Sequence, residues 1–102
     1  MSKTTYNPTP ERIAELKAQY PNGIYLIEAD GFKAIVRSPK RQELGYAATV
    51  GKNDPLKFNE VILKKCWLEG DQEIQTDDRI FMSVANQLDT IVETTEASIK
   101  KL

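Results

Sequence analysis

Histidine is absent from this sequence of 102 residues, and cysteine occurs once, as Cys66. Without histidine the chain lacks the commonest general base and metal ligand, and every nucleophile that a histidine activates. The five glycines are scattered, so they form no glycine-rich phosphate loop. These absences argue against hydrolases, zinc proteins and nucleotide-binding enzymes of the standard kinds. We therefore expect a protein that is not an enzyme and that uses no metal, cofactor or small-molecule substrate.

Long apolar runs are also missing. No segment approaches the ~20 apolar residues needed to cross a membrane. The first residues, MSKTTYNPTPERIAEL, lack the apolar stretch of a secretory signal. A lone cysteine cannot form an internal disulfide, which agrees with a reducing compartment. We expect a single domain covering residues 1–102, with residues 1–8 flexible, that stays in the cytoplasm and binds no membrane.

Charge is unevenly distributed along the chain. Residues 30–70 contain eight Lys and Arg against five Asp and Glu, whereas residues 71–102 contain three against seven. A mildly basic middle and an acidic end could attract each other, within one chain or between copies of a homo-oligomer. Neither segment has the dense basic face with interleaved aromatic residues that binds a phosphate backbone. We expect no nucleic-acid partner.

The residues that are present predict an α+β domain with one antiparallel β-hairpin. Asp30-Gly31 lies between two alternating segments, residues 23–29 and 32–38. Asp-Gly is a strong signal for a two-residue hairpin turn, because both turn positions need a positive φ. Two strands alone are marginal in water, so helices should cover one face of the hairpin. The residues expected on that buried face are Phe32, Ala34 and Val36.

About four helices are expected around the hairpin, in the order α-β-β-α-α-α. Thr9, Ser38 and Asp54 each precede a proline, a pair typical of an N-cap followed by the first helical residue. Thr76 is expected to open the last and longest helix. The predicted helices cover residues 10–20, 39–50, 55–68 and 77–99.

Several residues allow both a structural and a functional interpretation. A thiol beside lysines could be reactive, but Cys66 lies on an apolar helical face, where a cysteine is most often part of the core. Trp67 could either close the edge of the core or lie at a partner surface. The acids Glu69, Asp71 and Glu73 lack the ligand spacing of a calcium loop. The alternative is an enzyme that uses these carboxylates alone. The one feature that favours it is that the three acids lie close together in the sequence.

The end of the last predicted helix is a further candidate for partner binding. Ile99 and Leu102 continue its apolar spacing beyond the length that a small core would cover. They could form a docking surface, a frayed terminus or a late contact with the core. The candidate partner-binding residues are therefore Trp67, Ile99 and Leu102.

The order of these segments resembles the tail assembly chaperone-like proteins of tailed bacteriophages and prophages. The segments that carry the resemblance are GIYLIEADGFKAIVRSP, RQELGYAAT, DPLKFNEVILKKCWLEGDQEI and DDRIFMSVANQLDTIVETTEASIKKL. The resemblance implies a non-enzymatic protein of the bacterial or phage-infected cytoplasm that binds the tape-measure protein while the tail tube polymerises. It transfers no functional residue, since no residue-level motif is matched. The alternative is a small structural virion component, such as a connector or decoration protein, that acts by self-association.

Overall fold

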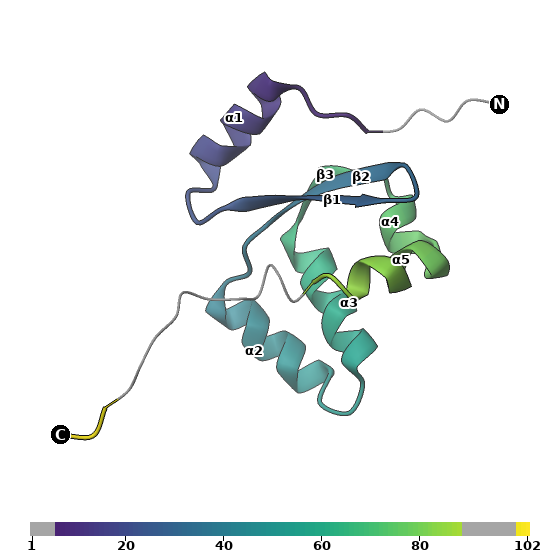
Figure 1. Ribbon diagram of the computed structural model, residues 1–102. Helices are drawn as coiled ribbons and strands as arrows, with labels where there is room; N and C mark the ends of the chain where they lie inside the picture. The colour runs from purple at the N-terminus through teal and green to yellow at the C-terminus, as the bar shows by residue number, and fades with distance from the viewer. Residues whose placement is uncertain (1–5, 89–99) are drawn as a thin grey trace.

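The structure is a computed structural model that describes residues 6–88 and 100–102. In this part of the chain an antiparallel three-stranded sheet lies between helix α1 on one side and the other helices on the opposite side (Figure 1). The fold is α+β, as the sequence predicts, and the sheet has one strand more than the predicted hairpin.

The predicted hairpin is confirmed. Strand β1 (Ile24–Ala29) pairs antiparallel with β2 (Phe32–Arg37) in a continuous register. The turn residues Asp30 and Gly31 have φ values of 52° and 83°. Positive φ at both positions gives a turn whose twist matches that of the flanking strands.

The third strand, β3 (Trp67–Gly70), pairs with the other side of β2, so the strand order is β1-β2-β3. The sequence predicts a helix over residues 55–68 that includes Trp67. Helix α3 (Pro55–Cys66) ends at Cys66 instead, and Trp67 is extended, with φ −62° and ψ 127°. Trp67 pairs with Val36 in the sheet, and this long-range pairing replaces the last helical turn that local periodicity predicts.

The core lies on both faces of β2. Phe32, Ala34 and Val36 are buried on the predicted face, against the helices α3, α4 (Glu73–Thr76) and α5 (Asp78–Ala85). The opposite face holds Ile35, which is buried on the side of helix α1 (Pro10–Gln19), whose buried residue is Leu16. The main core also contains Ala47, Val61, Ile62, Leu63, Cys66, Ile74, Ile80, Val84 and Leu88.

Two of the predicted helix caps are confirmed. Thr9 Oγ1 accepts a hydrogen bond from the Arg12 N–H at 3.1 Å at the start of α1. Asp54 Oδ1 accepts from the Lys57 N–H at 3.3 Å at the start of α3. In both helices a proline follows the cap, as the sequence predicts.

The predicted cap at Ser38 is wrong. Its N–H donates to Gly23 O at 3.1 Å and its hydroxyl donates to Asn22 O at 3.0 Å, so Ser38 prolongs the hairpin. Helix α2 (Arg41–Val50) begins later. The Glu43 carboxylate accepts from the Lys40 N–H at 2.9 Å, which satisfies a free donor at the helix start.

The last predicted helix is shorter. Thr76, which was expected to open it, ends α4 instead, and Asp77 caps α5 by accepting from the N–H groups of Arg79 and Ile80 at 3.0 and 3.1 Å. Asp77 accepts two amide hydrogen bonds, and aspartate is a better N-cap than threonine. Helix α5 ends at Ala85, and residues 86–88 form turns, so a single helix over residues 77–99 is wrong. Residues 89–99 lie outside the described part.

Candidate protein-binding groove

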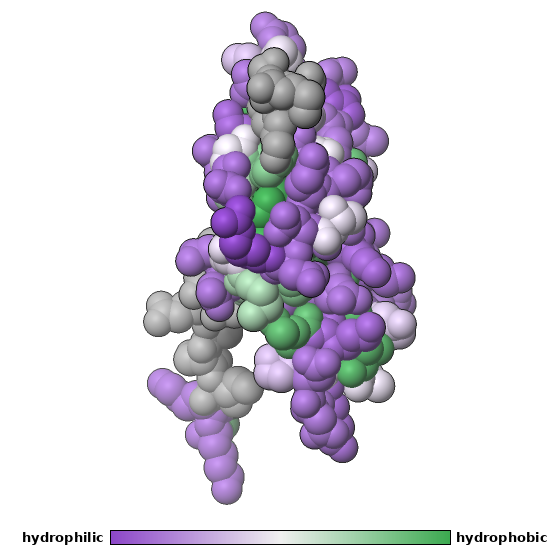
Figure 2. All heavy atoms as spheres, turned by 90° about the vertical axis from the view of Figure 1, so that its right-hand side faces the viewer, coloured by the Kyte–Doolittle hydropathy of each residue, from purple (hydrophilic) through white to green (hydrophobic). Residues whose placement is uncertain are grey.

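A groove of about 610 Å³ lies between β1, at one edge of the sheet, and α5. Its strand side consists of residues 25–30. Its helix side consists of α5 residues and the turn after them: Arg79, Ile80, Ser83, Val84, Gln87 and Leu88. Figure 1 shows α5 below the sheet, at the end that carries the hairpin tip, and Figure 2 shows patches of hydrophobic residues between hydrophilic ones on the face beside the hairpin tip.

The apolar floor of the groove follows from two periodicities. Along β1 every second side chain points to the helices, so Tyr25 and Ile27 pack against the main core. Along α5 and the following turn, Ile80, Val84 and Leu88 recur every four residues and are each 3% exposed. The floor is therefore made by side chains that also hold α5 against the sheet.

The rim of the groove is polar and mostly exposed. Ser83 and Gln87 lie on the solvent side of α5 and the following turn. At one end Arg79 Nη2 bonds Asp30 Oδ2 at 3.2 Å, which joins the start of α5 to the hairpin tip. Leu26, on the opposite face of β1 from the core, is 49% exposed. An apolar floor with a polar rim is typical of surfaces that bind another protein.

The backbone of β1 has one side without a partner strand in the described residues. Ser38 N–H bonds Gly23 O, and hydrogen-bonded pairs alternate along an antiparallel ladder. Tyr25, Ile27 and Ala29 therefore bond β2. The N–H and C=O groups of the alternate residues, Ile24, Leu26 and Glu28, point away from the sheet.

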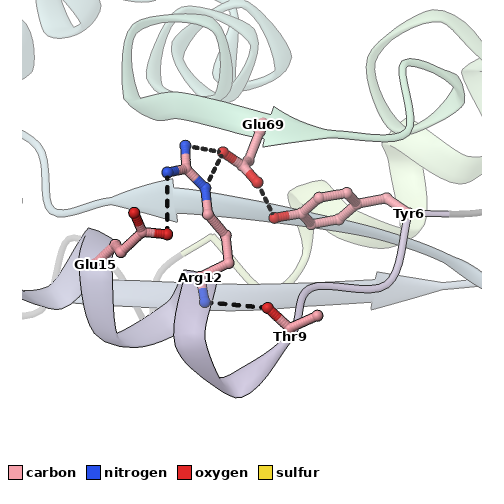
Figure 3. Close-up of polar contacts among 5 residues, drawn as sticks. All are labelled: Tyr6, Thr9, Arg12, Glu15 and Glu69. Atoms are coloured by element: carbon pink, nitrogen blue, oxygen red, sulfur yellow. Dashed lines mark hydrogen bonds and ion pairs between the residues drawn. The ribbon is translucent and has the colours of Figure 1, made fainter.

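A polar cluster on the α1 side holds the N-terminal segment against β3. Figure 3 shows Arg12 and Tyr6 pointing to the Glu69 carboxylate from two sides. Arg12 donates to Glu69 Oε1 from Nη2 at 2.6 Å and from Nε at 3.0 Å, and the Tyr6 hydroxyl donates to Oε2. These hydrogen bonds keep the pKa of Glu69 below its usual range, while burial and the Glu69 hydrogen bond raise the pKa of Tyr6.

The neighbouring acid has a similar structural role. Asp71 Oδ1 accepts from the Tyr6 N–H at 2.7 Å, and Oδ2 accepts from the Lys33 N–H at 2.9 Å. Glu69 and Asp71 therefore fasten the N-terminal segment and the sheet edge, and Glu73 lies in the first turn of α4. These contacts give the acids a structural role that involves no catalysis.

Cys66 is fully buried in the main core. Burial raises the pKa of its thiol to about 11, although the Arg37 guanidinium nearby acts in the opposite direction. A thiol with a raised pKa carries little of the nucleophilic thiolate at neutral pH. The structure therefore supports the core interpretation of Cys66.

Of the candidate residues taken from the sequence, Trp67 and Leu102 do not line the groove. Trp67 is half-buried on β3, at the opposite edge of the sheet, and packs against the core. Leu102 is fully exposed, and Ile99 lies outside the described residues. The sequence analysis missed the groove itself. Its helix side was visible as an apolar spacing, but no local signal shows that this helix runs beside β1.

The part of the chain that comprises residues 6–88 and 100–102 holds no cluster of His, Cys, Asp and Glu that could bind a metal ion. None of its helices has the length and apolar character required to cross a membrane. Comparison of the chain with protein-family models, curated proteins and solved structures finds no match.

Proposed function

We propose that the protein is a non-enzymatic assembly chaperone of the tailed-phage type, which binds an apolar segment of a tape-measure-like protein in the bacterial cytoplasm. The observation that supports this proposal is the groove between β1 and α5, with its apolar floor and open, polar rim. The resemblance of the sequence to tail assembly chaperone-like proteins supplies the class of partner.

The groove suits a holding function. Tyr25, Ile27 and Ala29 in the groove are only partly buried and offer apolar area, and burial of such area is worth about 25 cal/mol per Å². Ser83 and Gln87 at the rim stay in contact with water and limit non-specific association. Binding of this kind needs no nucleotide or metal, because its free energy comes from apolar burial.

The alternative function is that of a small structural virion component, which acts by self-association. The open backbone edge of β1 is the observation that favours it, because such an edge can pair with a strand of another copy. A structural component would assemble without a tape-measure-like protein, whereas a chaperone would keep that protein soluble.

Co-expression with a tape-measure-like protein tests the proposal. Ser83→Tyr places a ring at the groove, and Met82→Tyr places the same ring on the neighbouring, 48% exposed residue of α5 that does not line the groove. We expect the unmodified chain and Met82→Tyr to keep the tape-measure-like protein soluble, and Ser83→Tyr to lose most of this effect.

Two results would contradict the proposal at different levels. Equal solubility with Ser83→Tyr and Met82→Tyr would remove the groove as the binding site. No solubilisation by the unmodified chain would remove the chaperone function itself.

The C-terminal docking hypothesis has a separate test in the same assay. An Ile99→Asp, Leu102→Asp double variant places two charges at the predicted docking residues. If this end of the chain docks, the tape-measure-like protein should become less soluble, and equal solubility would discard its docking role.

A further inference from the structure

We infer that two copies of this chain pair antiparallel along β1, and that pairing joins their two grooves into one binding trough. The identity of the protein that the trough binds rests on the proposed function. The pairing rests only on the strand edge, the side chains beside it and their charges.

The β1 edge lacks the features that keep edge strands apart. Exposed edges of natural sheets usually carry lysine, proline or a bulge, or are very short. Strand β1 has the sequence IYLIEA, pairs with β2 along its whole length without irregularity, and carries one charge, at Glu28. The opposite edge, β3, has four residues and an irregularity in its pairing between Ile35 and Val36. Of the two edges, β1 is the one suited to accept a strand.

One register pairs all the outward-facing backbone groups of β1. A two-fold axis at Leu26 places Leu26 opposite Leu26 of the second copy, and Ile24 opposite Glu28. A register shifted to an axis at Tyr25 or Ile27 leaves one outward-facing residue of each copy without a partner in β1. The axis at Leu26 therefore gives the most complete ladder.

Side chains and charges favour the same register. The exposed Leu26 side chains meet across the axis and cover each other. The two Glu28 residues are then four positions apart, about 14 Å at 3.4 Å per residue, which is beyond the screening length of about 8 Å at physiological salt. With the axis at Ile27 they would be two positions apart, about 7 Å along the strand. Within each copy Glu28 lies opposite Lys33, which balances its charge.

Pairing also changes the groove. Antiparallel strands of one sheet are related by an axis perpendicular to that sheet, so both α5 helices lie on the same face. Tyr25 and Ile27 of each copy then contribute to a common floor, and the two α5 helices form its walls. A single copy supplies only one wall, so the complete trough requires the second copy.

Cysteine cross-linking tests the register. Leu26→Cys places the new thiols directly opposite, about 5.5 Å apart between Cα atoms, which a disulfide can bridge. Glu28→Cys places them too far apart, and the unmodified chain has only the buried Cys66. Under mild oxidation we expect Leu26→Cys to form mostly cross-linked dimer and the other two chains to stay uncross-linked. Equal cross-linking of Leu26→Cys and Glu28→Cys, or none with Leu26→Cys, would overturn the pairing.

Sedimentation of the full chain tests the association itself. Leu26→Lys puts two ammonium groups at the axis, and Leu56→Lys makes the same change at a 42% exposed residue of α3 away from the edge. The unmodified chain and Leu56→Lys should sediment as dimers, and Leu26→Lys as a monomer. A monomeric unmodified chain, or a dimeric Leu26→Lys variant, contradicts the inference.

The cross-linked Leu26→Cys dimer separates the trough from the proposed function. If the trough is correct, the oxidised dimer keeps the tape-measure-like protein soluble as well as the unmodified chain does. If the reduced variant holds this protein and the oxidised dimer does not, the trough is wrong and single-copy binding stands. If the unmodified chain never holds it, the proposed function fails, while cross-linking still decides the pairing.

Discussion

At the scale of single residues, Arg37 joins three elements. Its guanidinium donates to both carboxylate oxygens of Glu43 at 2.8 and 2.6 Å, and to Lys65 O at 2.8 Å. The contacts link β2 to α2 and to the end of α3. The Arg37 and Glu43 side chains are only 16% and 17% exposed, so water screens the pair weakly. Hydrogen bonding to Arg37 is the main cause that lowers the pKa of Glu43 to about 2.

The depressed pKa predicts acid sensitivity. In the unfolded chain a glutamate titrates near 4.3, so the pair stabilises the fold fully above about pH 5. This contribution is lost as the pH falls towards 2, because the unfolded chain then binds the proton more readily. Glu43→Gln should lower the free energy of unfolding by roughly 1–3 kcal/mol at pH 7 and by much less at pH 2. Urea unfolding measures the loss of unfolding free energy at pH 7 and at pH 2. An equal loss at the two pH values contradicts this role of the Arg37–Glu43 pair.

Among the elements, β3 depends on a close backbone approach. Gly70 has φ +149°, and a Cβ built there would lie 2.4 Å from Ala34 Cα. A side chain at this position would therefore collide with the backbone of β2. The absence of a side chain at Gly70 is what lets β3 complete the sheet.

Gly70→Ala should therefore destabilise the protein by at least about 2 kcal/mol, through the strained φ and the displaced strand. Gly45→Ala is the matched control, because Gly45 lies in α2 and a Cβ there meets nothing within 4 Å. That change should raise stability by about 0.5–1 kcal/mol, since alanine favours helix. Urea titration gives the unfolding free energies of the Gly70→Ala and Gly45→Ala variants for comparison with the unmodified chain. A Gly70→Ala variant as stable as the unmodified chain would remove this role of Gly70.

Local signals predicted the hairpin, the caps of α1 and α3 and the buried face of β2. These features are set by residues close together in the sequence, such as Asp30-Gly31. Strand β3 was missed because the apolar spacing of α3 continues through Trp67, and only pairing with Val36 converts it to a strand. Ser38 was misassigned for a related reason, since its hydroxyl has a competing acceptor in Asn22 O.

The groove could not be predicted from the sequence. Its helix side is recognisable in the apolar spacing of Ile80, Val84 and Leu88, but the spacing does not show which strand these residues face. The position of α5 is decided by the burial of Ile80, Val84 and Leu88 in the main core and by the packing of α5 beside β1. Both depend on packing between segments far apart in the chain.

For the whole molecule, the burial of Cys66 gives a measure of global opening. The thiol is fully buried between α3 and the sheet, so a labelling reagent reaches it only when the core opens. We expect Cys66 to react very slowly in native buffer and to react faster with urea in parallel with unfolding. The rate at which a thiol reagent labels Cys66 is compared with the unfolding that circular dichroism follows. Rapid labelling of the native protein would contradict a closed core.

The position of β2 between β1 and β3 has a consequence for synthesis on the ribosome. Strand β3 begins about thirty residues after β2 ends, which takes roughly 2–6 s at ordinary translation rates. Throughout this interval the nascent hairpin has two open backbone edges and an apolar face, with Phe32 and Val36 not yet covered by α3. During this interval the hairpin can pair with another nascent chain through these edges. The yield of folded protein then depends on how quickly residues 38–70 leave the exit tunnel.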